Sequence, residues 1–536
     1  MKDPTNRPGT LRLAATAISV AALSLGLVGC GTNKAETSSG GGSSGAVSDT
    51  LTMALSFTSN YDPDVFFDLE GTTITSALYE GLIRYAPSGD EIEGVLADSW
   101  EVSPDGLTIT FTLKPDLTFS DGSPIDAAAV KAAFERKAGV ASTPSYILAE
   151  VAGYEAPDAS TFVITLSQPV NNFLDRLAGP WGSLITNVAE LDANAVGDDL
   201  GQKYLEDNSA GSGPYVMTEF VPDERIVLDV NENYWGDKPF FKQVVFKVLP
   251  DSSAQRLQVE QGDIDIMQGP SPAAATELSS SDAVTVESLP AYALAAFQVN
   301  ITKAPFDDLA VRQALIKSIP YDDIVADVWG DEWATRSKQM LPKDRMPTDM
   351  AVFDPESDSG AFKKATADLD KSEPVLLGYI TPDIGNVSAR VNDYIGDILT
   401  DAGFEVQQVP ATSPEYFGYL GAPDVTPNLV FSAQSDDGIH PDNWFRLFLS
   451  TTGALSVGGI GLPEADALMD EGNLSPAGAA PDLEKYSEAS DLLAEAVHYI
   501  PLADVAPRYV FGTDITGLTN HRISPPAIWV ADLARK

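Results

Sequence analysis

The chain has 536 residues, of which 44% are hydrophobic, so it is long enough for about two to four domains with buried cores. It carries 78 acidic and 33 basic side chains, and this net charge of −45 argues against charge-driven binding to nucleic acid or to anionic lipid. Its single cysteine excludes an internal disulfide, so packing must stabilise the folded part.

The first 30 residues have the order of an export signal. Lys2, Arg7 and Arg12 form a basic start, residues 13–28 are uncharged and mostly apolar, and small residues lead into Cys30. The segment resembles a bacterial lipoprotein signal, which implies that a lipid joins the Cys30 thiol and that cleavage removes residues 1–29. A plain signal peptide or a short membrane anchor is the alternative, but the apolar stretch is shorter than the ~20 residues of a spanning helix.

A Gly/Ser-rich segment follows the signal. Residues 30–48 have no apolar periodicity, so we expect a flexible tether with an average reach of roughly 20–25 Å. The folded part is therefore expected at the outer face of the cytoplasmic membrane, either at the cell surface or in the periplasm.

The rest of the chain alternates between strand and helix patterns. Period-two stretches with one apolar face predict strands, and apolar residues at i, i+3, i+4 and i+7 predict helices. In chain order the expected elements are a strand at 108–114, a helix at 127–137 capped by Asp126, strands at 161–166, 225–230 and 244–248, helices at 311–319 and 388–401, and a strand from 404. Mixed elements over this length predict an α/β protein with more than one domain.

Several short motifs occur in a fixed order between residue 79 and about residue 315. They are Tyr79-Glu80-Gly81-Leu82, Leu96-Ala97-Asp98-Ser99-Trp100, Ser103-Pro104-Asp105-Gly106, Phe119-Ser120-Asp121-Gly122-Ser123-Pro124, Gly211-Ser212-Gly213-Pro214-Tyr215, Asn233-Tyr234-Trp235-Gly236, Gly262-Asp263-Ile264-Asp265, Pro305-Phe306-Asp307-Asp308 and Val311-Arg312-Gln313-Ala314-Leu315. Individually most of them are turn or core sequences. Together and in this order, they resemble the peptide/nickel-type solute-binding proteins, family 5, of ATP-binding-cassette (ABC) importers.

The resemblance implies an α/β fold of the periplasmic-binding-protein type II class, a two-lobe clamp with a hinge between the lobes and an extra inserted subdomain. Lobe I would combine residues 49–90, 211–300 and 506–536, with the inserted subdomain at 91–210. Lobe II would be residues 301–505. Closure about the hinge would bury a ligand between the lobes.

Two side chains are candidates for binding the ends of a peptide. The segment from Gln434 to Phe445 resembles a family loop whose first aspartate holds the ligand's α-amino group in the dipeptide-binding branch, and Asp437 occupies that position. Arg390 falls at the place of a carboxylate-binding arginine on the helix at 388–401. Asp437 could instead be an ordinary loop aspartate, and Arg390 could pair with Asp393 along an exposed helix face.

Two further residues of this loop are candidate contacts. His440 stands where the family usually has an acid, which could make ligand affinity depend on pH or complete the coordination of a nickel chelate. Trp444 could form an aromatic wall, although most buried tryptophans are core residues. The chain has only three histidines, His440, His498 and His521, without metal-binding spacing, so we expect no protein-built metal site and no cofactor.

The leading hypothesis is a monomeric, lipid-anchored binding protein that captures a short peptide and delivers it to the permease and ATPase of an ABC importer. Alternatives within the family are an oligosaccharide, an opine-like compound or a nickel chelate as cargo, and a sensor that feeds no importer. A secreted hydrolase is the alternative from another class. Against an enzyme, the sequence after the Gly/Ser-rich tether has no GxSxG nucleophile elbow, no HExxH and no phosphate-binding loop.

Overall fold

The computed structural model describes residues 48–536, except 69–70, 88–90, 183, 289–292, 344–352, 382, 384–385, 436, 459–460 and 520–526, and for residues 413–414 it describes the backbone alone. The predicted signal, Cys30, nearly all of the tether and His521 lie outside the described residues. Val47–Lys536 forms one compact unit. Among the helices that are described, none is both long enough and apolar enough to cross a membrane.

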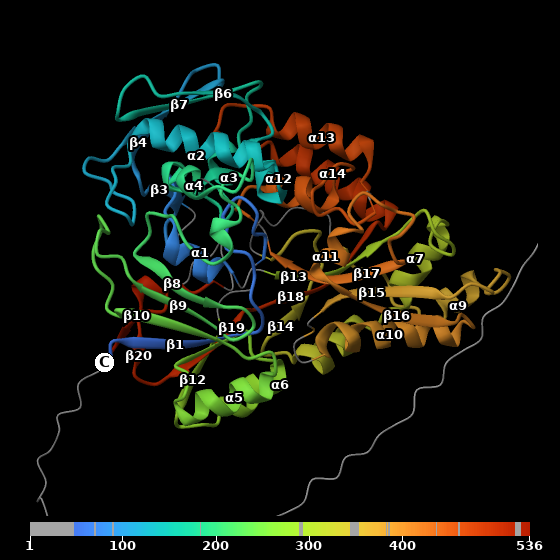
Figure 1. Cartoon of the computed structure of the whole chain (residues 1–536). Helices are drawn as coiled ribbons and strands as arrows, with labels where there is room; N and C mark the ends of the chain where they lie inside the picture. Colours follow the sequence, from blue (N-terminus) through green and yellow to red (C-terminus); the bar gives the residue numbers. More distant parts are fainter. Residues whose placement is uncertain are drawn as a thin grey trace, which may run out of the picture. The chain divides into compact units, whose positions relative to one another are not determined.

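The first large sheet has seven strands in the order β12-β19-β11-β1-β10-β9-β8. Its strands β8, β9, β10 and β1 follow one another in Figure 1. The strands are β1 (Thr50–Leu55), β8 (Tyr215–Val221), β9 (Arg225–Val230), β10 (Gln243–Val248), β11 (Ile266–Gln268), β12 (Val284–Ser288) and β19 (Arg508–Gly512). β1 lies between β10 and β11 and is parallel to both, although these strands are far apart in the sequence. Helices α5 (Ser252–Gln261) and α6 (Pro272–Leu278) pack near β19.

The second large sheet has six strands in the order β14-β18-β13-β17-β15-β16. The strands are β13 (Ala293–Val299), β14 (Ala334–Arg336), β15 (Val375–Thr381), β16 (Val406–Thr412), β17 (Leu429–Ser435) and β18 (Tyr499–Val505). Helix α10 (Val387–Asp401) crosses between the parallel strands β15 and β16 and packs on them. The buried face of α10, with Val391, Ile395 and Leu399, belongs to the largest hydrophobic core.

The chain passes between the two large sheets twice. It enters the six-stranded sheet between β12 and β13, and it returns between β18 and β19, where the connection is only Ala506 and Pro507. Short connections of this kind between two sheets are typical of hinges.

Strand β13 corrects one predicted boundary. The expected limit of lobe I at residue 300 assigns this strand to lobe I, but β13 pairs with β17 and β18 in the six-stranded sheet. The alternation of apolar residues within a strand does not reveal which strands it will pair with. The change of sheet therefore comes before Ala293, whereas the other predicted limit, between 505 and 506, falls between β18 and β19.

A four-stranded antiparallel sheet lies within residues 91–210, in the order β4-β5-β7-β6. The strands are β4 (Ala97–Val102), β5 (Thr108–Leu113), β6 (Val151–Glu155) and β7 (Thr161–Leu166), and the helices are α2 (Ala127–Val140), α3 (Phe173–Ala178) and α4 (Val188–Asn194). These elements share a hydrophobic core that includes Phe111, Phe134 and Phe162. We refer to residues 91–210 as the subdomain.

Shorter elements complete the fold. They are α1 (Thr72–Leu78), β2 (Ile83–Tyr85), β3 (Ile92–Gly94), α7 (Leu309–Ser318), α8 (Tyr321–Ile324), α9 (Ala361–Ala365), α11 (Ser413–Phe417), α12 (Pro441–Trp444), α13 (Pro463–Asn473), α14 (Leu483–Ala496), β20 (Ile515–Thr516) and β21 (Ala534–Arg535), with 3₁₀ turns at Thr143–Leu148, Tyr204–Glu206 and Val530–Asp532 and π-helical turns at Val325–Trp329 and Phe445–Leu449.

The predicted strands and helices are confirmed to within a few residues. Asp126 caps α2, because its side chain accepts a hydrogen bond from the Ala129 N–H at 2.9 Å. As the alternation in 108–113 and 161–166 predicts, β5 and β7 pair with each other and bury every second residue, among them Ile109, Phe111 and Phe162. Gly403 follows α10 with a positive φ of 95°, which is why the helix ends there.

A buried cluster of charges fixes the segment that follows β1. The Arg136 guanidinium of α2 donates to both carboxylate oxygens of Asp62, at 2.8 and 2.7 Å, and to Asp64 at 2.5 Å. Lys137 adds an ion pair to Asp64 at 3.0 Å. All four side chains are almost completely buried, so this cluster holds residues 62–64, and with them the neighbouring Phe66 and Phe67, against the subdomain.

Candidate functional site

The predicted ligand loop begins where β17 ends. Pro441 occupies the first turn of α12, and His440 caps this helix because its Nδ1 accepts a hydrogen bond from the Asp442 N–H at 3.1 Å. The loop therefore runs from a central strand of the six-stranded sheet directly into a short helix. This arrangement positions Asp437 by rigid elements on both sides.

Asp437 is 5% exposed and binds two side chains of the subdomain. The Trp181 Nε1–H donates to Oδ1 at 2.7 Å, and the Tyr146 hydroxyl donates to Oδ2. Burial and the charge of Asp437 raise the pKa of Tyr146 well above its usual value, so Tyr146 stays protonated and remains a donor. Asp437 thus lies where the loop of the six-stranded sheet meets the subdomain.

The two aromatic residues that bind this carboxylate, Tyr146 and Trp181, also pack against phenylalanine rings. The Phe67 and Trp181 rings are 4.5 Å apart between centroids, Phe66 is 4.8 Å from Trp181, and Phe67 is 6.3 Å from Tyr146. Ring faces carry partial negative charge and attract cations. We call Phe66, Phe67, Tyr146, Trp181 and Asp437 the Asp437 cage; its chemistry is complementary to an ammonium group.

Two glycines allow close packing around the loop. A Cβ on Gly179, just after α3, would come within 2.2 Å of the Asp437 carbonyl oxygen. A Cβ on Gly438 would come within 2.2 Å of Asn443 Nδ2 and 3.0 Å of the Tyr85 hydroxyl. The Ile439 N–H donates to Tyr85 Oη at 3.2 Å, which further fixes the loop. A larger residue at Gly179 would therefore clash with the main chain of Asp437.

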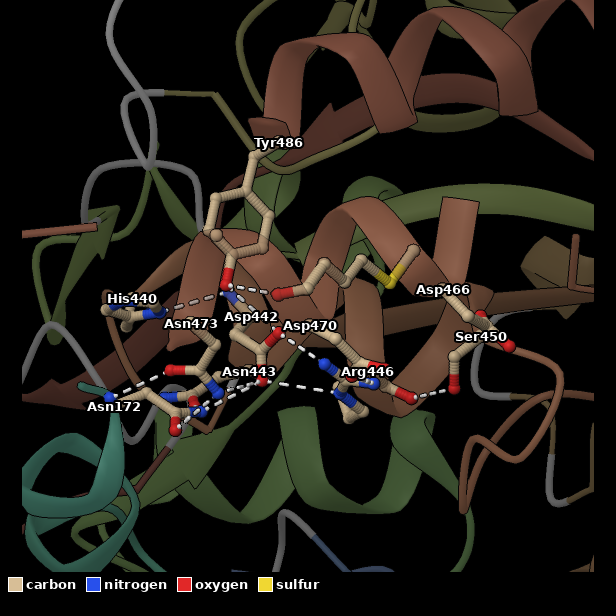
Figure 2. Close-up of polar contacts among 12 residues, drawn as sticks. Asn172, His440, Asp442, Asn443, Arg446, Ser450, Asp466, Asp470, Asn473 and Tyr486 are labelled. Carbon is tan, nitrogen blue, oxygen red and sulfur yellow. Dashed lines mark hydrogen bonds and ion pairs between the residues drawn. The ribbon is translucent and has the colours of Figure 1, made fainter. Parts of the chain in front are cut away.

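Asp442 is a buried hub just beyond the cage (Figure 2). Its Oδ1 accepts hydrogen bonds from Tyr486 Oη and Arg446 Nη2, both at 3.1 Å. Its Oδ2 accepts from Asn172 Nδ2 at 3.1 Å and Asn473 Nδ2 at 3.0 Å. Because Asn172 belongs to the subdomain while the other partners lie in 446–486, Asp442 joins the two parts structurally. Its place in the loop motif was the only sequence signal for it.

His440 is buried and uncharged near neutral pH. Burial lowers the pKa of His440 to about 3, with the nearby positive charge of Arg176 as the smaller cause. A histidine that is neutral from pH 5 to 8 cannot make ligand affinity depend on pH near neutrality. Its observed role is to cap α12 and to pack edge-on against Tyr486.

The substitution His440→Asn is expected to reduce the loss of stability in acid. The unfolded chain takes up a proton near pH 6.5 and the folded chain only near pH 3, so His440 costs stability as the pH falls through this interval, by about 2 kcal/mol at pH 5. Asparagine keeps an acceptor for the cap. Urea unfolding at pH 8 and pH 5 measures this; equal acid losses in both proteins would contradict it.

The other two predicted contacts are placed elsewhere. Trp444 is 1% exposed and packs against Phe448 at 4.5 Å in a hydrophobic core, so its position is that of a core residue and not of a cavity wall. The Arg390 guanidinium donates to the main-chain carbonyls of Asp327 and Val328. Among the described hydrogen bonds, none joins Arg390 to the Asp437 loop, so a role as carboxylate anchor stays a prediction.

The subdomain residues of the cage were missed from sequence. Tyr146 and Trp181 are 291 and 256 positions away from Asp437, and neither lies in a motif that marks a binding site. Their only signal was that aromatic residues favour such sites. No group of three or more His, Cys, Asp or Glu residues that could hold a metal ion occurs within the described ranges.

Comparison with known proteins identifies the family. Residues 91–456 match the model of the bacterial extracellular solute-binding proteins, family 5 Middle. The chain is 34% identical over 331 residues to the "Probable D,D-dipeptide-binding periplasmic protein DdpA" of Escherichia coli (strain K12); the match covers 60% of this chain and 62%, under two thirds, of that relative. It is 25% identical over 416 residues to the "Dipeptide-binding protein" of the same organism, with 73% and 76% of the two chains covered.

A solved structure shows the same fold. The periplasmic binding protein DppA from Helicobacter pylori, in complex with the peptide STSA, superposes with a TM-score of 0.79 at 22% identity, over 91% of this chain and 98% of that one. The predicted fold class is thereby confirmed as an α/β, two-lobe clamp of the periplasmic-binding-protein type. The family model covers more than half of the chain, and the chain belongs to the bacterial extracellular solute-binding proteins of family 5.

Proposed function

We propose that this protein captures a short peptide between its lobes and delivers it to an ABC importer at the outer face of the cytoplasmic membrane, to which a lipid on Cys30 anchors it. It makes no covalent change to its ligand. The observation that carries this proposal is the Asp437 cage, in which a buried carboxylate accepts hydrogen bonds from Tyr146 and Trp181.

The cage suits the α-amino group of a peptide. A buried carboxylate attracts an ammonium strongly because little water screens the pair, and charge-assisted hydrogen bonds are about twice as strong as neutral ones. A neutral sugar would need stacking rings and amides but not the carboxylate. The names of the two Escherichia coli relatives, both dipeptide-binding, support the same cargo class.

The two-lobe fold supports capture by closure. The described strands of the two large sheets are joined by only two crossings of the chain, so a few residues such as Ala506 and Pro507 can absorb a rotation of one lobe against the other. The closed form would present a single surface to a permease. For the ligand's carboxylate, Arg390 remains the sequence-based candidate.

Calorimetric titration tests the proposal. The protein is unfolded and refolded to remove carried-over ligand, and di-, tri- and pentapeptides are titrated together with their N-acetylated and C-amidated forms. We expect tight binding of free peptides that acetylation abolishes, because the amide has no positive charge for Asp437. Equal binding of free and acetylated peptides, or no binding at all, would contradict the proposal and direct the search to opines, sugars and metal chelates.

A further inference from the structure

A large cavity lies next to the Asp437 cage, between the subdomain and the lobe that contains the six-stranded sheet. Its volume is 520 Å³, within the range of sites for small organic ligands. Tyr146 belongs to both the cage and the cavity lining, and Asn443, six residues after Asp437, lines the cavity from the other side. A ligand whose amino group occupies the cage therefore has this cavity as a neighbouring space.

Two residues of the cavity lining each have a fully buried side-chain nitrogen that lacks a hydrogen-bond partner in the described part of the chain. Asn443 is 4% exposed and Arg176 is 7% exposed, and neither Asn443 Nδ2 nor Arg176 Nε has a protein acceptor. Leaving a buried donor unpaired costs about 1–3 kcal/mol.

The charged residues of the lining are mostly acidic. Four carboxylates line the cavity, those of Glu150, Asp442, Asp470 and Glu471, against the two guanidiniums of Arg176 and Arg446. Both guanidiniums are already paired. Arg176 pairs with Glu150 at 2.6 Å. Arg446 pairs with Asp442 at 3.1 Å and with Asp470 at 2.9 Å. Glu471 pairs at 3.1 Å with Lys485, a residue outside the cavity lining. The cavity therefore has a surplus of negative charge.

We infer that this cavity accepts the side chain of the ligand's first residue and selects a basic one, lysine or arginine. A cationic side chain is attracted by the surplus carboxylates, and an acidic side chain is repelled by them. This inference rests on the proposed function, since it assumes that the amino group of a peptide occupies the Asp437 cage.

Titration with three dipeptides of similar size tests this selection. Lys-Ala, norleucine-Ala and Glu-Ala share the same amino group and backbone, and norleucine has the length of lysine without its charge. We expect Lys-Ala to bind about tenfold more tightly than norleucine-Ala, and Glu-Ala to bind more weakly than both, a difference that shrinks at high salt. Equal binding of all three would overturn the inference but leave the proposed function standing. If none of the three bound, the inference would fail, and the titrations with tri- and pentapeptides would decide the proposed function separately.

A matched pair of variants locates the source of the preference. Glu471 and Glu488 both pair with Lys485, at 3.1 and 3.4 Å, but only Glu471 lines the cavity. Glu471→Gln combined with Asp470→Asn is expected to lower the preference for Lys-Ala over norleucine-Ala about threefold, whereas Glu488→Gln leaves it unchanged. An unchanged preference in the double variant, or an equal effect of Glu488→Gln, would show that the cavity does not select the charge.

Discussion

Replacing Asp437 with asparagine is expected to weaken the binding of a free dipeptide about 100-fold or more. The substitution keeps the shape of the side chain and one acceptor oxygen, but it removes the negative charge that offsets a buried ammonium group. Truncating one partner of a buried charge pair typically costs about 2–5 kcal/mol, and 100-fold corresponds to about 2.7 kcal/mol. Calorimetric titration of both proteins with the same peptide measures the loss.

The N-acetylated peptide provides the control for this experiment. Wild-type protein should distinguish free from acetylated peptide strongly, and Asp437→Asn should bind the two with nearly equal affinity, because only the charge interaction is removed. A variant that still prefers the free peptide as strongly as the wild type would show that Asp437 is not the amino anchor. Thermal unfolding of both proteins checks that the cage residues Tyr146 and Trp181 still pack around position 437.

The substitution Arg136→Met is expected to lower the free energy of unfolding by about 3–5 kcal/mol. It removes the guanidinium that compensates the carboxylates of Asp62 and Asp64, both of which are at most 1% exposed. An uncompensated buried charge is much more costly than a missing surface pair. Because Phe66 and Phe67 follow this segment directly, peptide binding should weaken as well. Urea unfolding and calorimetric titration measure the two effects.

A surface arginine gives the matched comparison. Arg225 pairs with Glu219 at 2.5 Å, as short as the Arg136–Asp64 bond, but both side chains are about 40% exposed. Arg225→Met should therefore cost less than about 1 kcal/mol and leave peptide affinity unchanged. Equal losses for Arg136→Met and Arg225→Met would contradict the assigned importance of the buried cluster.

The local structure could largely be predicted from the sequence. The alternation in 108–113 and 161–166 and the helical period in 387–401 specify a strand or a helix through neighbouring residues alone, and the structure has each of them. The ordered motifs between residues 79 and 315 likewise indicated the family, because turn and core residues recur wherever the same backbone must be built. Helix caps such as Asp126 are also local, since the acceptor and its N–H donor are three residues apart.

Only the tertiary structure decided how the site is assembled. The sequence singled out Asp437 but could not supply Tyr146 and Trp181, because the pairing of residues hundreds of positions apart depends on how the subdomain packs against the loop. It could not assign β13 to its sheet, because a strand's alternation does not name its neighbours. It could not separate Trp444 in the core from a tryptophan at a cavity wall, because burial depends on everything that packs around a side chain.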